Sequence, residues 1–519
     1  MSDLRRENRI SRLCNGGLLW IACGICAGLL LLNICFRTHI SRKEVVTVQV
    51  SLLRSTAILV LTAVAVIVAG LLPQKLQIPE KKCFLIWTAI YTVMALYLIL
   101  NVDTTLRSDA KAVFQAAVDY LNGHYERFAA DAYMGYYPHQ TGLMLYDAMV
   151  YRFGRNGITP FLANFCFVLG IQYLIWQIAD TVFHSRSVNL VTMGLSFAFL
   201  PQFFFILFVY GTIPGLFFML LAFYNGLLFS RTGSWRRLLA AALSCGAAVI
   251  LRKNYVIGVA ALVIFLCLRG LERKEKRRFP VAVCLIVLCT VATNQLVLSA
   301  VEAKSGQNLH DPMPTSLFIA MGTDLDNNQV RGPGWYNRYT IDTLESCDYD
   351  REAAGEIGWQ KVAQNLKDMK EDPVRAFRFF VKKLVSTWCD PLFQSVWSGP
   401  LENEEQYTHT ALLQSIYQRG TGMKVLGLFC KCIVLPMLCF AMLFLLAFHK
   451  ENRDWQLCYL YLIGGVLFHL FWETKSQYVY PYVFCLIPFA SFSFVASVQW
   501  FRGWFRRRRA RSQVNALTR

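Results

Sequence analysis

The stretch that decides the fold of this chain is residues 83–101, CFLIWTAIYTVMALYLILN, which carries no charged side chain. A helix needs about twenty apolar residues to cross a hydrocarbon core of ~30 Å, and this stretch has that length. Similar blocks recur along the 519 residues, of which 55% are hydrophobic and 16% charged. Because lipid offers no partner to an unpaired strand edge, we predict an all-α polytopic membrane protein with about twelve transmembrane helices. The predicted spans are residues 16–36, 55–72, 83–101, 159–179, 188–209, 211–230, 238–251, 255–268, 280–300, 424–447, 456–472 and 479–499.

The formal net charge of +19 is concentrated in short loops and tails. Such basic clusters mark the cytoplasmic side of a membrane protein, and alternating spans place all four of them on one side. We therefore predict a plasma-membrane protein with cytoplasmic N- and C-termini, a basic tail on anionic lipid and no nucleic-acid partner. The basic loop 37–54 opposes this orientation, because it falls on the outer side. The four clusters are residues 5–12, 231–237, 273–278 and 506–509.

Two long polar stretches, residues 102–158 and 301–423, interrupt the apolar blocks as two large extracytoplasmic loops. The second has a helical pattern over residues 350–388, where Asp372-Pro373 begins a new helix. The predicted organisation is a tail with two spans at 1–82, a membrane core at 83–300, a mostly helical outer domain at 301–423, C-terminal spans at 424–499 and a basic tail at 500–519. The short blocks 238–251 and 255–268 are either two crossings or a re-entrant hairpin.

The first outer loop contains the main candidate for a catalytic residue, Asp109. Ser108 is a suitable cap for a helix over Ala110–Asn122, and Gly123 stands where such a helix would end. A carboxylate at this position can take a proton from an acceptor hydroxyl as that hydroxyl attacks a sugar carbon. The structural alternative is that an acidic residue in a first turn stabilises the helix dipole.

Arg252 and Lys253 separate two apolar blocks at the predicted outer boundary of the membrane. Charge at membrane depth is costly and is generally functional. Arginine offers a bidentate fork to phosphate and lysine a compact charge, so this pair is a candidate for holding a lipid phosphate. The alternative is that both side chains only extend to the lipid headgroups.

Glu473, Lys475 and Tyr478 lie in the turn between the last two spans. Lys475 can present its charge to a phosphate, with Glu473 orienting it, because the turn falls on the same face as Asp109. The alternative is an ordinary interfacial turn with an aromatic belt.

Tyr137 and His139 belong to an aromatic and polar turn of the first outer loop. His139 is a candidate for proton transfer or phosphate binding, although a lone loop histidine is more often neither. Asp147, on a helical segment that follows, is either a second acid or part of a solvated face. No cysteine and histidine cluster has zinc-ligand spacing, so no metal ligand is assigned, and a divalent cation is left open.

In their order and common sidedness, these motifs resemble the membrane-embedded glycosyltransferases of the GT-C fold, in particular the bacterial family-39-like proteins. That group is similar to protein O-mannosyltransferases and to aminoarabinose transferases. The resemblance covers about residues 83–499. It rests on Ser108-Asp109, Tyr136-Tyr137-Pro138, Arg252-Lys253-Asn254 and residues 472–479, WETKSQYV.

The resemblance implies a polyprenyl-phosphate sugar donor, with Asp109 at the position of the family's catalytic carboxylate. It implies that Arg252, Lys253 and Lys475 lie near the donor phosphate. The chain departs from the family at Ala110, where many relatives have a second acid or amide. It also departs at Gln477, where relatives often have arginine, and both departures concern the donor contacts.

The leading hypothesis is inverting sugar transfer from this donor to an extracytoplasmic glycan, lipid or protein, with Asp109 as general base. Glu473, Tyr478, His139 and Tyr137 would support the site. A transporter or flippase is the main alternative, and it predicts ionisable groups near the middle of the membrane and related halves. The sequence has few charges within the spans and no evident repeat. A non-catalytic assembly subunit is the third reading.

Overall fold

The computed structural model describes residues 9–41, 43–72, 78–272, 278–326, 331–400 and 408–517, and side chains as far as Arg508. Within these residues the chain is mostly helical, with one two-stranded sheet. Residues 5–8 and 273–277 of two predicted basic clusters, Arg42 of the loop 37–54, and the side chain of Arg509 lie outside the described part.

Each predicted span is helical in the structure. Within the described ranges, nine helices are long and apolar enough to cross a membrane, or ten if one bent pair counts as a single span. The count of about twelve therefore stays a prediction, because α20 (Trp455–Phe471) and α11 (Trp235–Leu251) are shorter. The nine spans contain α1 (Arg9–Cys35), α2 (Leu52–Leu71), α3 (Glu80–Leu100), α7 (Thr159–Phe183), α10 (Thr212–Thr232), α12 (Val256–Glu272), α13 (Arg278–Ser305), α19 (Thr421–Leu443, continued by a π-turn at Phe444–Phe448) and α22 (Ile487–Leu517).

Two predicted spans have breaks that matter for the site. The predicted span at 188–209 is bent, because α8 (Arg186–Ala198) and α9 (Leu200–Phe204) meet at an angle of 48°. Pro201 causes this bend, since its ring and missing N–H prevent α8 from continuing. The two short blocks form α11 and α12, which are separated by Arg252 and a 3₁₀ turn over Lys253–Tyr255.

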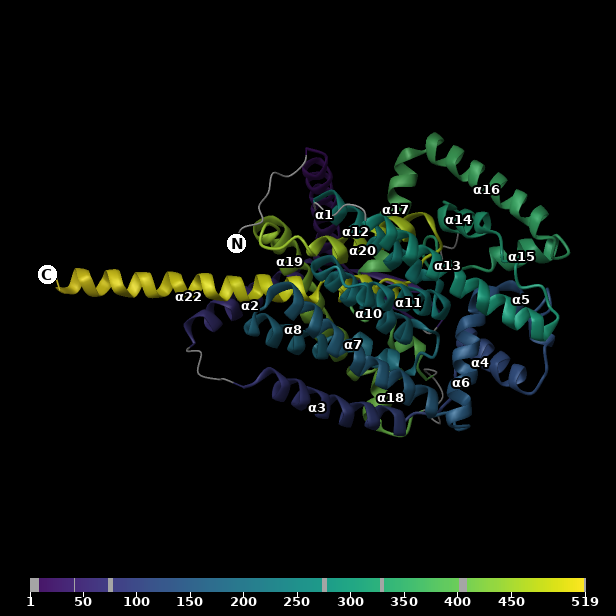
Figure 1. The fold of residues 1–519 in the computed structure, drawn as a ribbon. Coiled ribbons are helices and arrows are strands. Elements are labelled where there is room, and N and C mark those ends of the chain that lie inside the picture. Colours follow the sequence, from purple (N-terminus) through teal and green to yellow (C-terminus); the bar gives the residue numbers. More distant parts are fainter. Residues whose placement is uncertain are drawn as a thin grey trace.

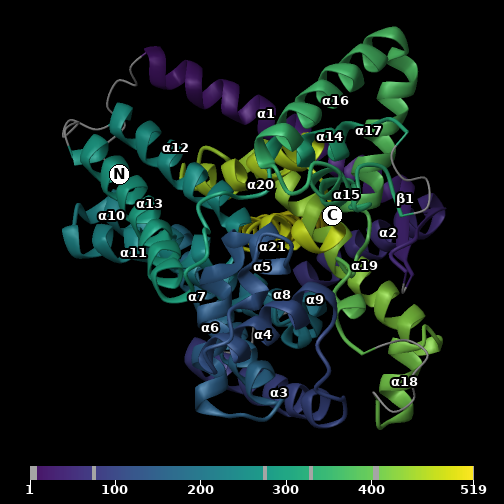
Figure 2. The same cartoon turned by 90° about the vertical axis from the view of Figure 1, so that its right-hand side faces the viewer.

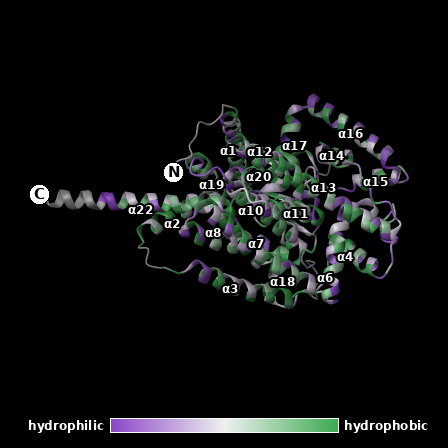
Figure 3. Ribbon diagram, in the orientation of Figure 1, coloured by the Kyte–Doolittle hydropathy of each residue, from purple (hydrophilic) through white to green (hydrophobic). Residues whose placement is uncertain are grey.

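The helices of the two polar stretches lie at one end of the molecule, and the C-terminal half of α22 projects from the opposite end (Figure 1). Figure 2 looks onto the first of these ends, with α4–α6 on one side, α14–α17 on the other and β1 at the edge. Hydrophilic residues are prominent along α16 (Figure 3). The bounds of these helices are α4 (Ser108–Leu121), α5 (Tyr133–Tyr136), α6 (Thr141–Phe153), α14 (Thr315–Thr323), α15 (Tyr339–Ser346), α16 (Arg351–Glu371) and α17 (Pro373–Trp388), and the short helices α18 (Ala411–Tyr417) and α21 (Tyr480–Phe484) complete the fold.

The helical prediction for residues 350–388 is confirmed, and its local cause is visible. Asp350 caps α16 by accepting from the backbone N–H groups of Glu352 and Ala353. Asp372 caps α17 in the same way, and Pro373 occupies its first turn. Each carboxylate satisfies N–H groups that have no partner within the helix.

The loop 37–54, which the charge pattern could not explain, forms a β-hairpin between α1 and α2. Its strands, β1 (Phe36–Ile40) and β2 (Val46–Val50), are antiparallel, with Phe36 opposite Val50. The N–H of Thr38 donates to the carbonyl of Cys389 at 3.1 Å, and the N–H of Val46 donates to that of Arg331 at 2.9 Å. The hairpin is therefore fixed to the segment before α15 and to the segment just after α17.

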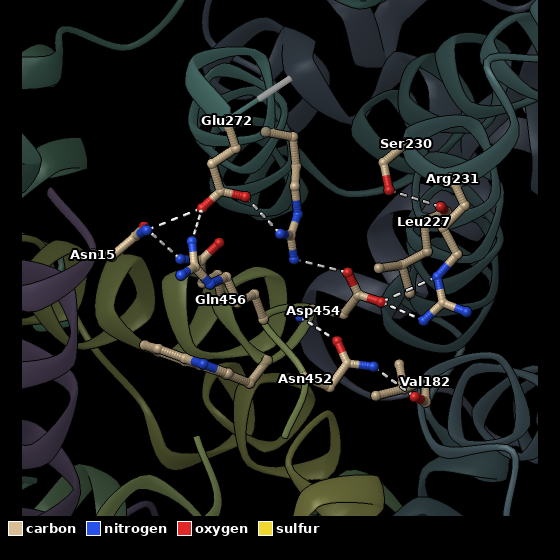
Figure 4. Close-up of polar contacts among 12 residues, drawn as sticks. Asn15, Val182, Leu227, Ser230, Arg231, Glu272, Asn452, Asp454 and Gln456 are labelled. Carbon is tan, nitrogen blue, oxygen red and sulfur yellow. Dashed lines mark hydrogen bonds and ion pairs between the residues drawn. The ribbon is translucent and has the colours of Figure 1, made fainter. Parts of the chain in front are cut away.

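A buried ionic network ties several helices together (Figure 4). Asp454, just before α20, accepts from Arg231 of α10 at 2.5 Å and from Arg269 of α12 at 2.8 Å. Glu272 accepts from Arg269 at 2.9 Å and from Asn15 of α1 at 2.9 Å. The network thus joins the helix ends that carry the predicted cytoplasmic charges.

We expect Asp454→Ala to destabilise the fold by about 3–5 kcal/mol, because it leaves buried arginine charge without a partner. Side-chain exposures of 7% for Asp454 and 10% for Arg269 make this pair a buried one. Thermal unfolding of the purified protein in detergent measures the effect. The matched control is Asp342→Ala. Asp342 is 58% exposed and its partner Arg338 is 59% exposed, so we expect the free energy of unfolding to change by at most about 1 kcal/mol. Equal losses in both variants would contradict a structural role for the network.

Candidate active site

Asp109 is the second residue of α4, and this helix lies at the end of the molecule opposite the C-terminal part of α22 (Figure 1). The helix confirms the prediction for Ala110–Asn122, but Ser108 is its first residue and not its cap. Ser108 has a φ of 45°, so the chain turns sharply just before Asp109. The guanidinium of Arg107 lies 4.3 Å from the ring centre of Trp397 and donates to its backbone carbonyl. These contacts fix the start of α4 against the segment that follows α17.

The side chain of Asp109 is accessible to solvent, yet enough protein surrounds it that desolvation raises its pKa. The positive charges of Lys475 and Arg252 lower that pKa, and the negative charge of Glu44 raises it. The structure therefore brings Asp109, Arg252 and Lys475, from three distant segments, within electrostatic range of one another. A carboxylate with a raised pKa next to fixed cations is a common feature of catalytic sites.

Lys475 is held by a carboxylate that the sequence analysis did not select. Its Nζ lies 2.8 Å from Oε1 and 3.0 Å from Oε2 of Glu44, which stands in the turn of the β1–β2 hairpin. The side chains are 10% and 7% exposed. Gln394 donates to Oε1 of Glu44 at 2.9 Å, and the φ of Glu44 is 58°, in the left-handed region. The N-terminal hairpin thus reaches into the site and orients the Lys475 ammonium.

Glu473 lies two residues before Lys475 and is almost fully buried. Desolvation raises the pKa of Glu473 to about 7, while Lys475 and the hydroxyl of Tyr478 lower it. That hydroxyl donates to Oε1 of Glu473 at 3.2 Å. The negative charges of Glu44 and Asp109 also raise this pKa, so the three carboxylates form one coupled group.

Arg252 stands at the break between α11 and α12. Its Nη1 donates to the carbonyl of Tyr210 at 2.8 Å, and its guanidinium lies over the rings of Tyr210 and Tyr478. It lines a small pocket together with Gln477 and Tyr478, so the predicted phosphate residue and the predicted final turn share one wall. A guanidinium in contact with aromatic faces keeps donors available in a fixed plane.

The charges of Lys475, Glu44 and Arg252 act on Asp109. Lys253 and Arg252 both act on His139, whose pKa falls to about 4 through desolvation and then through these two charges. His139 is therefore neutral near pH 7, and its ring packs against the edge of Tyr137 at 5.9 Å. A charged histidine at a phosphate does not fit this environment.

Five tyrosines lie within electrostatic range of the carboxylate of Asp109. Desolvation raises the pKa of each, and the charge of Asp109 raises it further. The hydroxyls of Tyr133 and Tyr210 lie 3.1 Å apart, and Tyr137 and Tyr336 are joined by a hydrogen bond. Lys475 lies 5.8 Å from the ring centre of Tyr336. The group consists of Tyr133, Tyr137, Tyr210, Tyr336 and Tyr478.

A buried lysine of α17 holds the turn that carries Glu473 and Lys475. The Nζ of Lys383 donates to the carbonyls of Gly322 at 2.6 Å, Leu470 at 2.9 Å and Trp472 at 2.8 Å. Desolvation lowers its pKa to about 7. A Cβ on Gly334 would come within 2.6 Å of the Lys383 side chain, so only glycine allows this close approach. Lys383 of α17 thereby positions the final turn.

Asp147 has a different environment from the other carboxylates. It is fully buried in α6, and both carboxylate oxygens are without a hydrogen-bond partner in the described part of the chain. Desolvation raises its pKa well above the usual range. The reading of Asp147 as part of a solvated face is therefore wrong. No group of three His, Cys, Asp or Glu side chains that could hold a metal ion occurs in the described ranges.

Residues 18–498 match a family described as conserved hypothetical integral membrane proteins. The chain belongs to this family. Together with its apolar helices, this makes it a multi-pass integral membrane protein. No curated protein matches the sequence. One solved structure that matches is ArnT from Cupriavidus metallidurans bound to undecaprenyl phosphate, with 14% identity, a TM-score of 0.36, and coverage of 79% of this chain and 77% of that chain. A similarity of this size does not assign a fold or an activity.

Within this integral membrane family, the matched region includes the β1–β2 hairpin and therefore Glu44. Glu44 and Tyr336 were missed because their relation to Asp109 exists only in the folded chain. Two features of the sequence could have pointed to these residues. The basic loop 37–54 contradicted the charge rule, and the turn at 332–336, GPGWY, places an aromatic pair after two glycines.

Proposed function

We propose that this protein transfers a sugar from a polyprenyl-phosphate donor to an acceptor hydroxyl on the outer side of the membrane, with inversion. The observation that carries the proposal is the grouping of Asp109, whose pKa is raised, with Arg252 and Lys475. A base and two phosphate-binding cations are the groups that such a transfer requires. The motif resemblance to GT-C glycosyltransferases supports the same assignment.

In this scheme the acceptor oxygen attacks the anomeric carbon from the side opposite the phosphate. The new carbon–oxygen bond forms as the bond to the phosphate oxygen breaks, and the electron pair leaves with the lipid phosphate. Asp109 takes the hydroxyl proton, and Arg252 and Lys475 stabilise the charge that develops on the phosphate. A single displacement of this kind inverts the anomeric centre, and fixed donors in a partly dry site stabilise it by several kcal/mol.

The supporting residues act on these three. Glu473 fixes Tyr478, whose ring lies against Arg252. His139 and Tyr137 line the approach to Asp109 as neutral groups, because the pKa of His139 is about 4. Lys253 is at the edge of this arrangement, and we propose no direct phosphate contact for it.

A transporter would have ionisable groups in the middle of the membrane, and Lys431 lies within α19, one of the helices long enough to span it. Its Nζ donates to the carbonyls of Asn33 and Phe36, where α1 ends. A lysine bound to a helix end has a structural role.

Undecaprenyl phosphate, added to purified protein in lipid nanodiscs, tests the donor site. We expect the wild type to bind it and Arg252→Met and Lys475→Met each to weaken binding about 10-fold or more, because each loses a charge-assisted contact. The matched control is Lys367→Met, since this lysine is 66% exposed on α16. Mass spectrometry of co-purified lipid gives a second readout. Absence of polyprenyl phosphate from the wild type in both measurements would contradict the proposal.

A further inference from the structure

The helix α17 has an exposed apolar stripe, although it is outside the predicted membrane spans. Phe377 is 70% exposed and Val374 is 59% exposed, and Val381, one turn further on, is partly buried. These residues are three and four positions apart, so they share one face of the helix. The opposite face is buried and includes Lys383, which holds the turn that carries Glu473. A row of apolar side chains on a surface helix indicates an interaction site.

Two cations stand beside this apolar stripe. Arg378 and Lys382 are four residues apart, so they lie on the same side of α17. Both are exposed, and neither forms an ion pair within the described part of the chain. Arg375 differs from them, because it donates to Asp326. An apolar stripe next to cations without a protein partner is the pattern of a helix that lies on an anionic lipid surface.

Contacts with two apolar helices set the level of α17 along the molecule. The Nδ2 of Asn33, in the last turn of α1, donates to the carbonyl of Trp388 at 3.1 Å. The ring of Phe380 lies 6.3 Å from the ring of Phe471, the last residue of α20. The helix α1 is long and apolar enough to cross a membrane, and it ends where α17 contacts it. The helix α17 therefore lies at the level of a membrane boundary.

The apolar stripe is continuous with an apolar surface of α20. Leu467 and Phe471 are one turn apart on α20, and both are exposed. In an integral membrane protein, such residues on an apolar helix face lipid. Phe380 joins this surface to α17, and α16 and α17 lie at the periphery of the molecule (Figure 2). A lipid leaflet would cover both surfaces at once, whereas a soluble partner protein would have to stop at the lipid-facing part of α20.

We propose that α17 lies in the headgroup region of the lipid leaflet at this end of the molecule. Its apolar stripe would contact the acyl boundary, and Arg378 and Lys382 would bind the phosphates of anionic phospholipids. The same helix carries Lys383 on its other face, so one rigid element contacts both the membrane surface and the turn that carries Glu473 and Lys475. The inference does not depend on sugar transfer, because it rests on α17 and its neighbours alone.

The test is photo-crosslinking of the full-length protein in nanodiscs made of equal parts of phosphatidylcholine and phosphatidylglycerol. The photoreactive probe p-benzoylphenylalanine replaces Phe377, and in a control protein it replaces Asp342 of α15, which lies further from the membrane-spanning helices (Figure 1). Mass spectrometry should find lipid adducts at position 377 and at least about tenfold fewer at position 342. At position 377, adducts of phosphatidylglycerol should exceed those of phosphatidylcholine by at least about threefold, because each nearby cation attracts anionic lipid.

The two cations are tested in the protein that carries the probe at Phe377. Combining Arg378→Gln with Lys382→Gln should bring the ratio of the two lipids close to one, because the attraction for anionic lipid is removed. The matched control is Arg338→Gln, since this exposed arginine just before α15 should leave the ratio unchanged. Thermal unfolding shows whether each protein is folded, and a second probe at Val374 gives an independent reading if one variant is not.

Equally few lipid adducts at the probes on α17 and at position 342 would overturn the inference. A protein adduct in place of lipid, with the same probe in cell membranes, would also overturn it, because the stripe would then be a protein-docking surface. An excess of phosphatidylglycerol that persists in the folded double variant would contradict the roles of Arg378 and Lys382. The measurement contains no sugar donor, so its outcome is independent of the test of the proposed function.

Discussion

Replacing Asp109 with asparagine is expected to lower sugar transfer by about 10²–10⁴-fold, the range typical for loss of a general base. Asparagine keeps the size and the position in α4 but cannot accept the hydroxyl proton. Donor binding should change little, since Arg252 and Lys475 remain. The measurement is the initial rate of label transfer in membranes, using the glycosylated lipid that co-purifies with the wild type.

The pH profile of transfer gives a second readout of Asp109. A base must be deprotonated, so the rate should fall as the pH falls through the raised pKa of Asp109. Asp119→Asn is the matched control on the same helix, where Arg127 pairs with Asp119 at 2.5 Å near the surface. Near-normal turnover in Asp109→Asn would exclude the proposed role.

The sequence carried much of the fold, because span length and helix caps are local properties. Twenty apolar residues predict a membrane helix wherever they stand, and Asp372-Pro373 predicts a helix start from its own chemistry. The bend at Pro201 was also a local signal. It was missed because the apolar pattern continues across it, and hydropathy does not register a missing N–H.

The site was predictable only in part. Asp109, Arg252 and Lys475 stood out because each is a charge beside an apolar block. Lys253 has the same local pattern as Arg252, and both charges lower the pKa of His139, whereas the charge of Arg252 also lowers that of Asp109. The sequence alone does not separate two adjacent cations of this kind.

Glu44 could not be selected from the sequence, because its contact with Lys475 depends on a hairpin that packs against segments about 300 residues further along the chain. The segment VTVQV forms β2, which the all-α prediction did not include, and only the contacts of β1 and β2 with Cys389 and Arg331 place the turn at Lys475. The basic loop 37–54, which did not fit the charge rule, therefore contains a residue of the candidate site. The basic residues of the loop accompany a carboxylate that orients the Lys475 ammonium.

Glu44→Gln is expected to destabilise the protein by about 3–5 kcal/mol, because it leaves the ammonium of Lys475 buried without its carboxylate. Adding Lys475→Met should recover most of this stability, since no charge is then left unpaired. Transfer should stay at least tenfold below the wild type in both proteins. Glu371→Gln is the matched control, because its pair with Lys367 is about 65% exposed, and no more than about 1 kcal/mol is expected there.

The pH profile of transfer tests whether Glu44 acts in the site as well as in folding. Its negative charge raises the pKa of both Asp109 and Glu473. Removing that charge lowers both pKa values, so in Glu44→Gln the loss of activity on acidification should move to lower pH. A merely structural residue would reduce the amount of active protein and leave the position of this limb unchanged. An unshifted acid limb in folded Glu44→Gln would thus assign Glu44 to stability alone, whereas a shifted limb would make the hairpin part of the catalytic electrostatics.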